Sequence, residues 1–284
     1  MSISGAATLA GIIGWPVAHS RSPALHGYWL QKYGIDGAYV PMAVKPENLR
    51  RALQALPTLG FAGCNLTIPH KEEALRAVDS YEPSAKRAGG VNTVTVDPRG
   101  NLIGASTDGY GFIAALRAAA PGFDPGQAPT VVLGAGGAAR AIVAALLDHG
   151  AQEVRLVNRT PERAAKLAKE LGGEVRGIAW EKRTTALAGA ALLVNATSLG
   201  MEGQPALDLP LDALPTEAVV NDIVYAPLET PLLAAARARG NRCVDGLGML
   251  LHQAAPGFEA WFRVKPEIDD GLRQAVLATL PPKR

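Results

Sequence analysis

Cysteine is scarce in this chain of 284 residues, and neither sign of charge is in clear excess. The two cysteines, Cys64 and Cys243, stand in apolar, strand-like surroundings without a CxxC pattern or neighbouring histidines. We therefore expect buried free thiols, with a disulfide or a metal site as the alternative. Lys and Arg number 28 against 26 Asp and Glu, and the basic residues are scattered along the chain. This balance argues against a nucleic-acid partner or a membrane-surface partner.

Long apolar segments are missing as well. No run reaches about 18 apolar residues, the length that a membrane-spanning helix needs. Residues 1–9 lack the basic cluster and the long apolar core of a signal peptide. The composition, with 48% hydrophobic and 19% charged residues, is nevertheless that of a folded protein. We therefore expect a cytoplasmic protein, and its length suits two domains.

Short β-branched runs alternate with stretches of helical period along most of the chain. This alternation predicts an α/β fold in which helices cover parallel sheets. Pro23 suits the first turn of a helix, where its missing N–H costs nothing. In the first half we expect a helix at 22–33 and strands at 9–13, 38–44, 61–66 and 91–96.

The second half begins with a predicted helix over 107–119 and the Pro/Gly-rich stretch 121–129, the best linker candidate. Strands and helices then alternate as in a doubly wound nucleotide-binding domain. They are expected at 130–133, 153–157, 191–194, 219–223 and 242–244 (strands) and at 138–149 and 161–171 (helices). Residues 246–284 predict two amphipathic helices, split at Lys265 and Pro266, that pack back on the first domain. We expect a substrate domain of residues 1–106 and 246–284 and a Rossmann-type cofactor domain of residues 107–245.

A glycine-rich segment joins a predicted strand to a predicted helix. It reads Gly134-Ala135-Gly136-Gly137-Ala138 and directly follows Val131-Val132-Leu133. Gly134 permits the tight turn, Gly136 lets the backbone approach a pyrophosphate, and Ala139 keeps the helix close to the strand. The exposed N–H groups at the start of the helix would hold the pyrophosphate. A glycine-rich connection without a ligand is the alternative.

The second strand of this domain ends in Asn158-Arg159-Thr160. Sites for NAD usually carry Asp or Glu here, about 20 residues after the glycines, to bind the ribose. The guanidinium of Arg159 can instead pair with a ribose phosphate, which favours NADP(H) as the cofactor. A solvated Arg159 and Thr160 as a helix N-cap are the simpler interpretations, although Thr160 can cap and bind at once.

Several further segments occur together in one order. They are Ser20-Arg21-Ser22-Pro23, Asn65-Leu66-Thr67-Ile68-Pro69-His70-Lys71, Val91-Asn92-Thr93, Ser106-Thr107-Asp108-Gly109, Asn195-Ala196-Thr197-Ser198 and Asp245-Gly246-Leu247-Gly248-Met249-Leu250. With them the chain, from about Ile13 to Gln253, resembles the shikimate dehydrogenase family. The resemblance implies reversible NADPH-dependent reduction of 3-dehydroshikimate to shikimate, a step of aromatic amino acid biosynthesis. We expect a monomer or homodimer with small-molecule partners, and the scattered histidines indicate no metal.

The resemblance assigns proton transfer to Lys71, with Asp108 beside it as the second member of the acid/base pair. Ketone reduction needs a proton at the carbonyl oxygen as hydride reaches the carbon. Taken alone, Lys71 would be a surface lysine at a helix start and Asp108 an N-cap or first-turn acid. Only the family match places the two side chains together.

Other polar residues are expected to bind the substrate. Ser20 and Ser22 can face a carboxylate together with N–H groups of a helix start, although Ser22 can also cap that helix. Neutral groups that suit ring hydroxyls are those of Asn65, Thr67 and Asn92, to which the resemblance adds Tyr225 and Gln253. The resemblance places the nicotinamide near Ile223, Gly246 and Met249. It also includes Thr197 among the cofactor-binding residues. Gly246 and Gly248 would equally suit a tight domain junction.

Three positions depart from the usual family pattern. Ser106 stands where Asn usually precedes Thr-Asp-Gly, Gly90 where Ala usually precedes Val-Asn-Thr, and Trp15 in a segment that often has Asn. They bear on fine substrate preference rather than on the reaction class. Two alternatives stay open, a quinate/shikimate dehydrogenase that uses NAD and a non-catalytic sensor of the same ligands.

Overall fold

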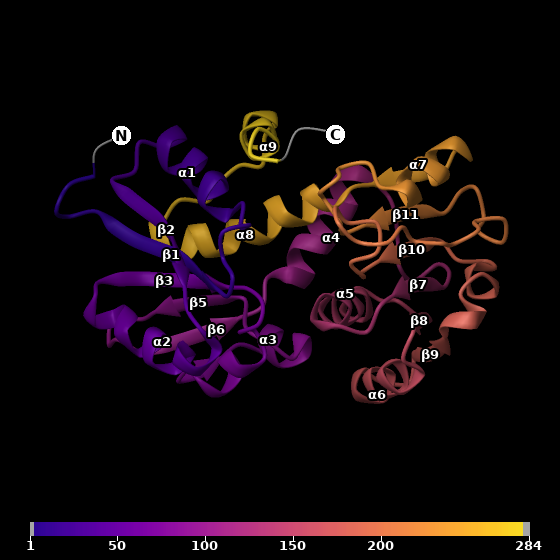
Figure 1. Ribbon diagram of the computed structural model, residues 1–284, viewed down its shortest axis with the longest axis horizontal. Coiled ribbons are helices and arrows are strands. Elements are labelled where there is room, and N and C mark those ends of the chain that lie inside the picture. Colours follow the sequence, from indigo (N-terminus) through magenta and orange to yellow (C-terminus); the bar gives the residue numbers. More distant parts are fainter. Residues whose placement is uncertain (1–2, 281–284) are drawn as a thin grey trace. The chain divides into compact units, whose positions relative to one another are not determined.

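The computed structural model describes residues 3–280, which divide into two compact units. The first unit contains the residues up to Thr107 together with 253–280, and the second contains 108–252. Each unit holds a six-stranded sheet (Figure 1). Within residues 3–280, no helix is both long enough and apolar enough to span a membrane.

The sheet of the first unit has the strand order β2-β1-β3-β5-β6-β4. Its strands are β1 (Thr8–Gly14), β2 (Gly37–Ala43), β3 (Phe61–Leu66), β4 (Ser80–Tyr81), β5 (Thr93–Val96) and β6 (Leu102–Ala105). The strand β1 runs parallel to β2 and β3, whereas β5 runs antiparallel to both β3 and β6. The sheet is therefore mixed: β1, β2 and β3 are parallel as expected, and so are β4 and β6, whereas the antiparallel β5 departs from our expectation. Between β5 and β6 the cause is the short turn in which Asp97 Oδ1 accepts hydrogen bonds from Arg99 N and Asn101 N, because so short a turn joins only antiparallel strands.

Helices cover both faces of this sheet (Figure 1). They are α1 (Ser22–Lys32), α2 (Leu49–Thr58), α3 (Pro83–Ala88) and the end of α8 (Gly246–Phe262), with short 3-10 turns η1 (Pro46–Asn48) and η2 (Glu73–Arg76). The last helix, α9 (Asp270–Leu277), packs on α1. The apolar face of α2, formed by Leu49, Leu53 and Leu56, is buried at helical spacing. The end of α8 and the start of α9 contact this unit: Trp261 Nε1 donates to Val94 O at 3.0 Å, and Tyr28 Oη donates to Oδ1 of Asp269, the N-cap of α9, at 3.1 Å. The first turns of α8, up to His252, belong to the second unit.

His26 of α1 lies fully buried among aromatic rings, stacked on Tyr39 with 3.9 Å between the ring centroids. Burial lowers its pKa from 6.5 to about 3. Between these values the unfolded chain binds a proton that the folded chain does not, so the free energy of unfolding falls as the pH drops below 6.5. The loss amounts to about 1.4 kcal/mol per pH unit across that window.

We predict that H26F, which keeps an aromatic ring but cannot titrate, removes this contribution to acid sensitivity. Urea unfolding midpoints measured between about pH 7 and about pH 4.5 should then fall less steeply than in the wild type. The matched control is H149F, because His149 is an exposed histidine of the second unit. Equal slopes for H26F and the wild type would contradict the prediction.

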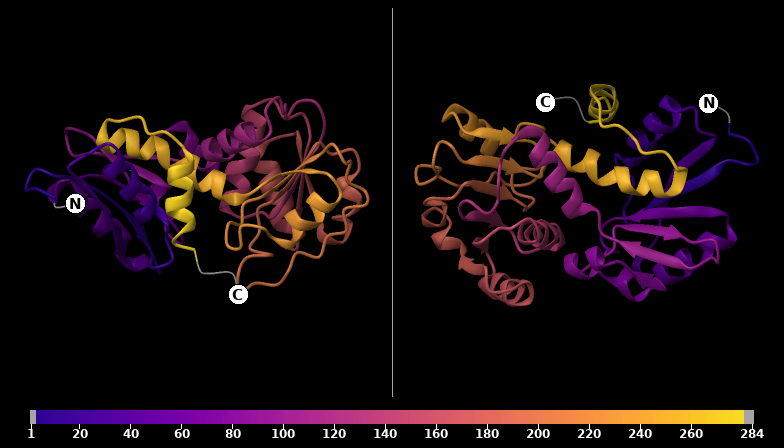
Figure 2. Two further views of the ribbon diagram at one scale, coloured as in Figure 1. Left: turned by 90° about the horizontal axis from the view of Figure 1, so that it is seen from above. Right: turned by 180° about the vertical axis from the view of Figure 1, so that it is seen from behind.

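The second unit holds a sheet in which every pair of strands is parallel (Figure 2). The strand order is β12-β11-β10-β7-β8-β9, as in a doubly wound domain. The strands are β7 (Thr130–Leu133), β8 (Val154–Asn158), β9 (Val175–Ala179), β10 (Leu192–Asn195), β11 (Val219–Asp222) and β12 (Arg242–Val244). The chain continues from β7 outward to β9 and then returns to β10 on the other side of β7. The carboxyl ends of β7 and β10 therefore border the switch point at which such sheets bind ligands.

Helices also cover both faces of the second sheet. They are α4 (Asp108–Ala119), α5 (Gly137–Asp148), α6 (Pro161–Leu171) and α7 (Pro231–Ala238), with 3-10 turns η3 (Trp180–Lys182) and η4 (Thr185–Leu187). Residues of α4, α5 and α6 share one buried apolar cluster, and those of η4 and α7 share another. The predicted doubly wound order is confirmed, and the edge strand β9 is an addition to it.

Candidate active site

The glycine-rich segment forms the predicted turn between β7 and α5. Gly134 has a φ of +107°, and a Cβ there would lie 2.9 Å from Ala196 O, so both backbone angle and space demand glycine. Around Gly136 and Gly137, no described heavy atom lies within 4 Å of where a Cβ would be. Ala139, two residues after Gly137, is fully buried. The backbone of Ala196 thus fills the space next to Gly134, whereas the space next to Gly136 and Gly137, at the start of the helix, is open.

This open helix start fits an anionic group. The first N–H groups of an α-helix lack partners within the helix, and the helix dipole adds positive charge there. Gly136 is the N-cap residue of α5 and is exposed, while Ala135 and Ala138 beside it are half-buried. The residues therefore suit the pyrophosphate of a dinucleotide, the role that the sequence predicted for them.

The residues after β8 present a second polar surface. Arg159 and Thr160 are exposed, and Asn158 Nδ2 donates to Thr160 O at 3.0 Å. Thr160 occupies the N-cap position of α6, but its side chain makes no capping hydrogen bond within the described structure. The alternative interpretation of Thr160 as a helix N-cap is thus correct for its position in the helix. It is wrong in that the hydroxyl group makes no capping hydrogen bond.

Two buried polar residues hold the loops that follow β10 and β11. Asn195 Nδ2 donates to Asp222 Oδ1 at 3.0 Å, and Asn195 Oδ1 accepts from Thr197 Oγ1 at 2.7 Å. Asp222 Oδ2 accepts from Thr230 Oγ1 at 2.7 Å. Burial raises the pKa of Asp222, although its hydrogen bonds act in the opposite direction. This network fixes Thr197, a predicted cofactor residue, at the switch point of the sheet.

The start of α8 packs tightly against the end of β11. A Cβ at Gly246 would lie 2.2 Å from Ile223 O, so no larger residue fits without a backbone shift. Both residues are predicted to lie near the nicotinamide, as is Met249, which is buried on the next turn of α8. Gly246 was also expected to suit a tight junction between domains, but this close contact joins two segments of the second unit. Tyr225, predicted to bind substrate, is half-buried after this same strand.

The predicted substrate residues of the first unit include a buried pair of amides on β3 and just before β5. Asn65 Nδ2 donates to Asn92 O and to Thr93 Oγ1, each at 3.1 Å. Asn65 Oδ1 accepts from Tyr39 Oη at 2.7 Å. Both amide hydrogens of Asn65 are thus engaged by the protein, and toward a ligand this side chain can only accept a hydrogen bond.

Asn92 brings together three segments that are distant in the chain. Its Nδ2 donates to Thr107 Oγ1 at 3.0 Å and to Gln253 Oε1 at 3.4 Å, and its Oδ1 accepts from Thr107 N at 2.9 Å. The structure therefore places Asn92 and Gln253 in contact, as a shared substrate site requires. Thr107 is the residue before Asp108.

The remaining predicted residues of the first unit follow the carboxyl ends of β1 and β3. Ser22 N donates to Ser20 Oγ at 3.2 Å. Ser22 is the first residue of α1 and Arg21 its N-cap, so the interpretation of Ser22 as the cap is wrong. Thr67 N donates to Ile13 O at 3.0 Å, and Lys71 is half-buried at the end of the turn that Thr67 begins. These side chains thus share the edge of a sheet where α/β proteins bind ligands.

Asp108 is the first residue of α4 and an acid of its first turn, as its simpler interpretation states. It belongs to the second unit, whereas Lys71 belongs to the first. The pairing of these two side chains stays a prediction.

Three polar residues of this site were not singled out from the sequence: Tyr39, Thr93 and Thr107. Tyr39 is 8% exposed on a strand that was predicted from its apolar residues. A buried tyrosine hydroxyl needs a hydrogen-bond partner. Tyr39 in a buried strand could therefore have predicted a polar neighbour such as Asn65. Thr107 belongs to a quoted motif, but only its contact with Asn92 reveals what it does.

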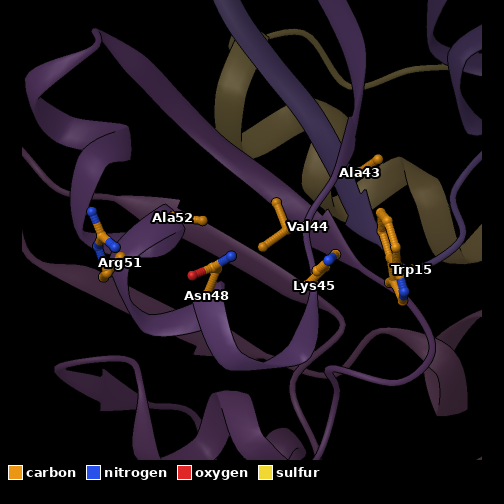
Figure 3. A pocket seen from close by; sticks show the side chains of 7 residues that line it. All are labelled: Trp15, Ala43, Val44, Lys45, Asn48, Arg51 and Ala52. Atoms are coloured by element: carbon orange, nitrogen blue, oxygen red, sulfur yellow. The ribbon is translucent and has the colours of Figure 1, made fainter.

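A surface hollow of about 560 Å³ lies beside the ends of β1 and β2 (Figure 3). It is lined by Trp15, Ala43, Val44, Lys45, Asn48, Arg51 and Ala52. Lys45 Nζ lies 5.8 Å from the centroid of the Trp15 ring. The lining contains none of the residues predicted to bind substrate.

Comparisons with known proteins agree with these features. The family model described as the shikimate dehydrogenase substrate binding domain matches residues 12–94. The model described as shikimate / quinate 5-dehydrogenase matches residues 119–201.

Relatives cover nearly the whole chain. Shikimate dehydrogenase (NADP(+)) of Paramagnetospirillum magneticum is 59% identical over 276 residues, 97% of this chain and 100% of that protein. The structure of shikimate 5-dehydrogenase from Thermus thermophilus in complex with NADP(H) and shikimate is 40% identical, with a TM-score of 0.85 over 96% of this chain and 100% of that one. Quinate dehydrogenase from Corynebacterium glutamicum in complex with NAD is 32% identical, with a TM-score of 0.89 over 96% and 99%. This chain therefore belongs to the shikimate dehydrogenase family.

Proposed function

We propose that the chain catalyses the reversible reduction of 3-dehydroshikimate to shikimate, with NADPH as the cofactor. The observation that carries this proposal is the 59% identity, over 97% of the chain, to a protein named shikimate dehydrogenase (NADP(+)). The polar network around Asn92 supports it, because a hydroxyl-rich ring needs neutral donors and acceptors at fixed positions.

The first unit supplies most of the groups that bind the substrate, and Tyr225 comes from the second unit. Ser20 and Ser22 receive the carboxylate, beside the N–H groups at the start of α1. The ring hydroxyls go to the remaining substrate residues, which are Asn65 as an acceptor, Thr67, Asn92, Tyr225 and Gln253. An analogue without one of these hydroxyls leaves a buried polar group unpaired, at a cost of about 1–3 kcal/mol, and is rejected for that reason.

Lys71 moves the proton. In the direction of reduction its ammonium group donates a proton to the ketone oxygen, and in oxidation its neutral amine takes that proton back. Asp108 orients Lys71 and exchanges protons with it. This part of the proposal is supported by the chain path, because Asp108 directly follows Thr107, which is hydrogen-bonded to Asn92.

The second unit would hold NADPH, which supplies the hydride when bound. The segment from Gly134 to Ala138, at the open start of α5, would hold its pyrophosphate. Asn158, Arg159 and Thr160 bind the ribose phosphate, and the guanidinium provides the charge. Thr197, Ile223, Gly246 and Met249, beside the carboxyl ends of β10 and β11, would hold the nicotinamide end.

We predict that R159A raises the KM for NADP about 10- to 100-fold, because a charge-assisted hydrogen bond contributes about 1.5–3 kcal/mol. The KM for NAD, which has no ribose phosphate, should stay unchanged. Initial rates of shikimate oxidation at varied cofactor concentration measure both constants. R117A is the control, since Arg117 is also an exposed arginine of the second unit. Equal effects of R159A on both cofactors would contradict a role in binding the phosphate.

A panel of two substrates and two cofactors tests the proposed function. The purified protein should oxidise shikimate with NADP faster than quinate with NADP, and either substrate faster with NADP than with NAD. A preference for quinate with NAD would instead make it resemble the Corynebacterium glutamicum enzyme. Tight binding of shikimate without any turnover would show a sensor rather than an enzyme.

We also propose that the protein works in the cytoplasm as a monomer or homodimer, with small molecules as its partners. The even charge balance fits small-molecule partners rather than nucleic acid or a membrane surface. Light scattering of the purified chain measures its assembly.

A further inference from the structure

The turn that presents Lys71 begins with two backbone anchors. Thr67 N donates to Ile13 O at 3.0 Å, and Trp15 N donates to Ile68 O at 3.1 Å. These bonds tie the first half of the turn to the end of β1. Ile68 and Pro69 then point outward, and the side chain of Ile68 is 75% exposed. The second half of the turn, which leads directly into Lys71, is closed by His70 N, which donates to Thr67 O at 2.9 Å, but this bond does not anchor it to the sheet.

His70 provides that anchor through its side chain. The residue is only 1% exposed, and its Nε2 lies 2.8 Å from Val44 O, just after β2. A carbonyl oxygen can only accept, so Nε2 carries a hydrogen and donates it. Val44 is itself fixed, because its N–H donates to Gly14 O at 3.1 Å. The imidazole therefore links the Lys71 turn to β2, and through β2 to β1.

Lys71 is held from its other side by the segment before β5. Val91 N donates to Lys71 O at 2.8 Å. Gly90 packs so closely that a Cβ there would lie 3.1 Å from Lys71 O and 3.2 Å from Lys71 C. The backbone on both sides of the Lys71 Cα is thus constrained, by His70 before it and by Val91 after it. The direction of the lysine side chain depends on both constraints.

We propose that His70 is a positioning residue, whose Nε2–H bond to the Val44 carbonyl holds the turn in the orientation that lets Lys71 reach the substrate. The inference rests on the proposed function, because it needs Lys71 as the proton donor. The competing explanation is that His70 merely fills space beneath the turn. The two explanations differ in one requirement: a positioning role needs the donor, whereas a filling role needs only the volume.

Three substitutions separate these explanations. H70F keeps a ring of similar size but has no donor. H70Q places an amide N–H near the position of Nε2, and H70N carries the same amide on a side chain that is too short to reach Val44 O. We expect kcat and kcat/KM for shikimate oxidation to fall together by about 10- to 100-fold in H70F and H70N, since small misplacement of a reacting group has effects of this size. H70Q should stay within about threefold of the wild type, because its hydrogen bond to Val44 is retained.

The matched control is H149F. His149 makes the same kind of bond, with Nδ1 lying 2.8 Å from Ala145 O, but at an exposed helix end of the second unit. Its kinetic constants should not change. Wild-type turnover in H70F, or equal losses in H70Q and H70N, would overturn the proposal. If H70F fails to fold, the comparison of H70Q with H70N decides alone.

A parallel measurement on K71M distinguishes a failure of the proposed role of Lys71 from a failure of the inference about His70. If K71M retains wild-type turnover, the proposed role of Lys71 fails, whatever the His70 variants do. If K71M loses turnover while H70F and H70N keep it, only the inference about His70 fails.

Discussion

Replacing Lys71 with methionine will lower kcat for shikimate oxidation at least about a hundredfold, the lower end of what general acid/base catalysis contributes. Methionine keeps most of the length and apolar surface of the side chain but can neither donate nor accept the proton. Lys71 is half-buried and follows the turn at the end of β3, so the substitution exposes no core. Turnover is measured from the formation of NADPH, at saturating shikimate and NADP.

Two controls separate a loss of proton transfer in K71M from a general effect of the substitution. K86M changes an exposed lysine on α3 of the same unit and should leave kcat unchanged. Shikimate binding to K71M, measured by calorimetry, should persist, because most of the polar groups of the site are intact. A K71M protein with wild-type kcat would remove Lys71 from the reaction. If K71M neither binds shikimate nor shows a cooperative unfolding transition, the variant has a folding defect instead.

The sequence patterns located most of the fold because they are local. The predicted strands 61–66, 130–133 and 242–244 and the helix 161–171 coincide with β3, β7, β12 and α6. Apolar runs with clear boundaries specify such elements by themselves. β9 was missed since its exposed positions, Arg176 and Gly177, break the apolar pattern at the edge of the sheet.

What the patterns could not supply is anything that depends on residues far apart in the chain. The antiparallel pairing of β5 with β6 follows from the hydrogen-bonded turn between them, which an apolar run cannot reveal. The same holds for the site. The motifs identified Asn65 and Asn92, but the bonds to Tyr39 and Thr107, which decide how these amides are oriented, became visible only in the folded chain. The contact between Lys71 and Asp108 stays a prediction for the same reason.

Gly63 gives the clearest case of a residue whose importance no motif indicated. It lies in β3 at a bulge, because Leu9 pairs with Phe61 while the next residue of β1, Ala10, pairs with Gly63. A glycine within a strand often marks such a bulge or a close approach of another group. Both occur here: Gly63 has a φ of +154°, and the indole of Trp261 lies directly against it.

Substituting alanine for Gly63 will destabilise the protein by about 3 kcal/mol, through overpacking and the loss of a buried hydrogen bond. A Cβ would lie 2.0 Å from Val94 O and 2.3 Å from Trp261 Nε1, the two atoms that share a hydrogen bond of 3.0 Å. The methyl group must therefore displace the indole from β5, and with it the end of α8 that covers this face of the sheet. Urea unfolding measures the loss as a lower midpoint.

The control for this substitution is G27A. Gly27 is exposed in the middle of α1, and no described heavy atom lies within 4 Å of where its Cβ would be. Alanine is the better helix former by about 1 kcal/mol, so G27A should raise the midpoint that G63A lowers. Opposite shifts from one chemical change would show that the position of the added methyl group, and not glycine content, determines stability. A G63A midpoint equal to that of the wild type would mean that Trp261 and β5 separate without cost, which a buried hydrogen bond between them does not allow.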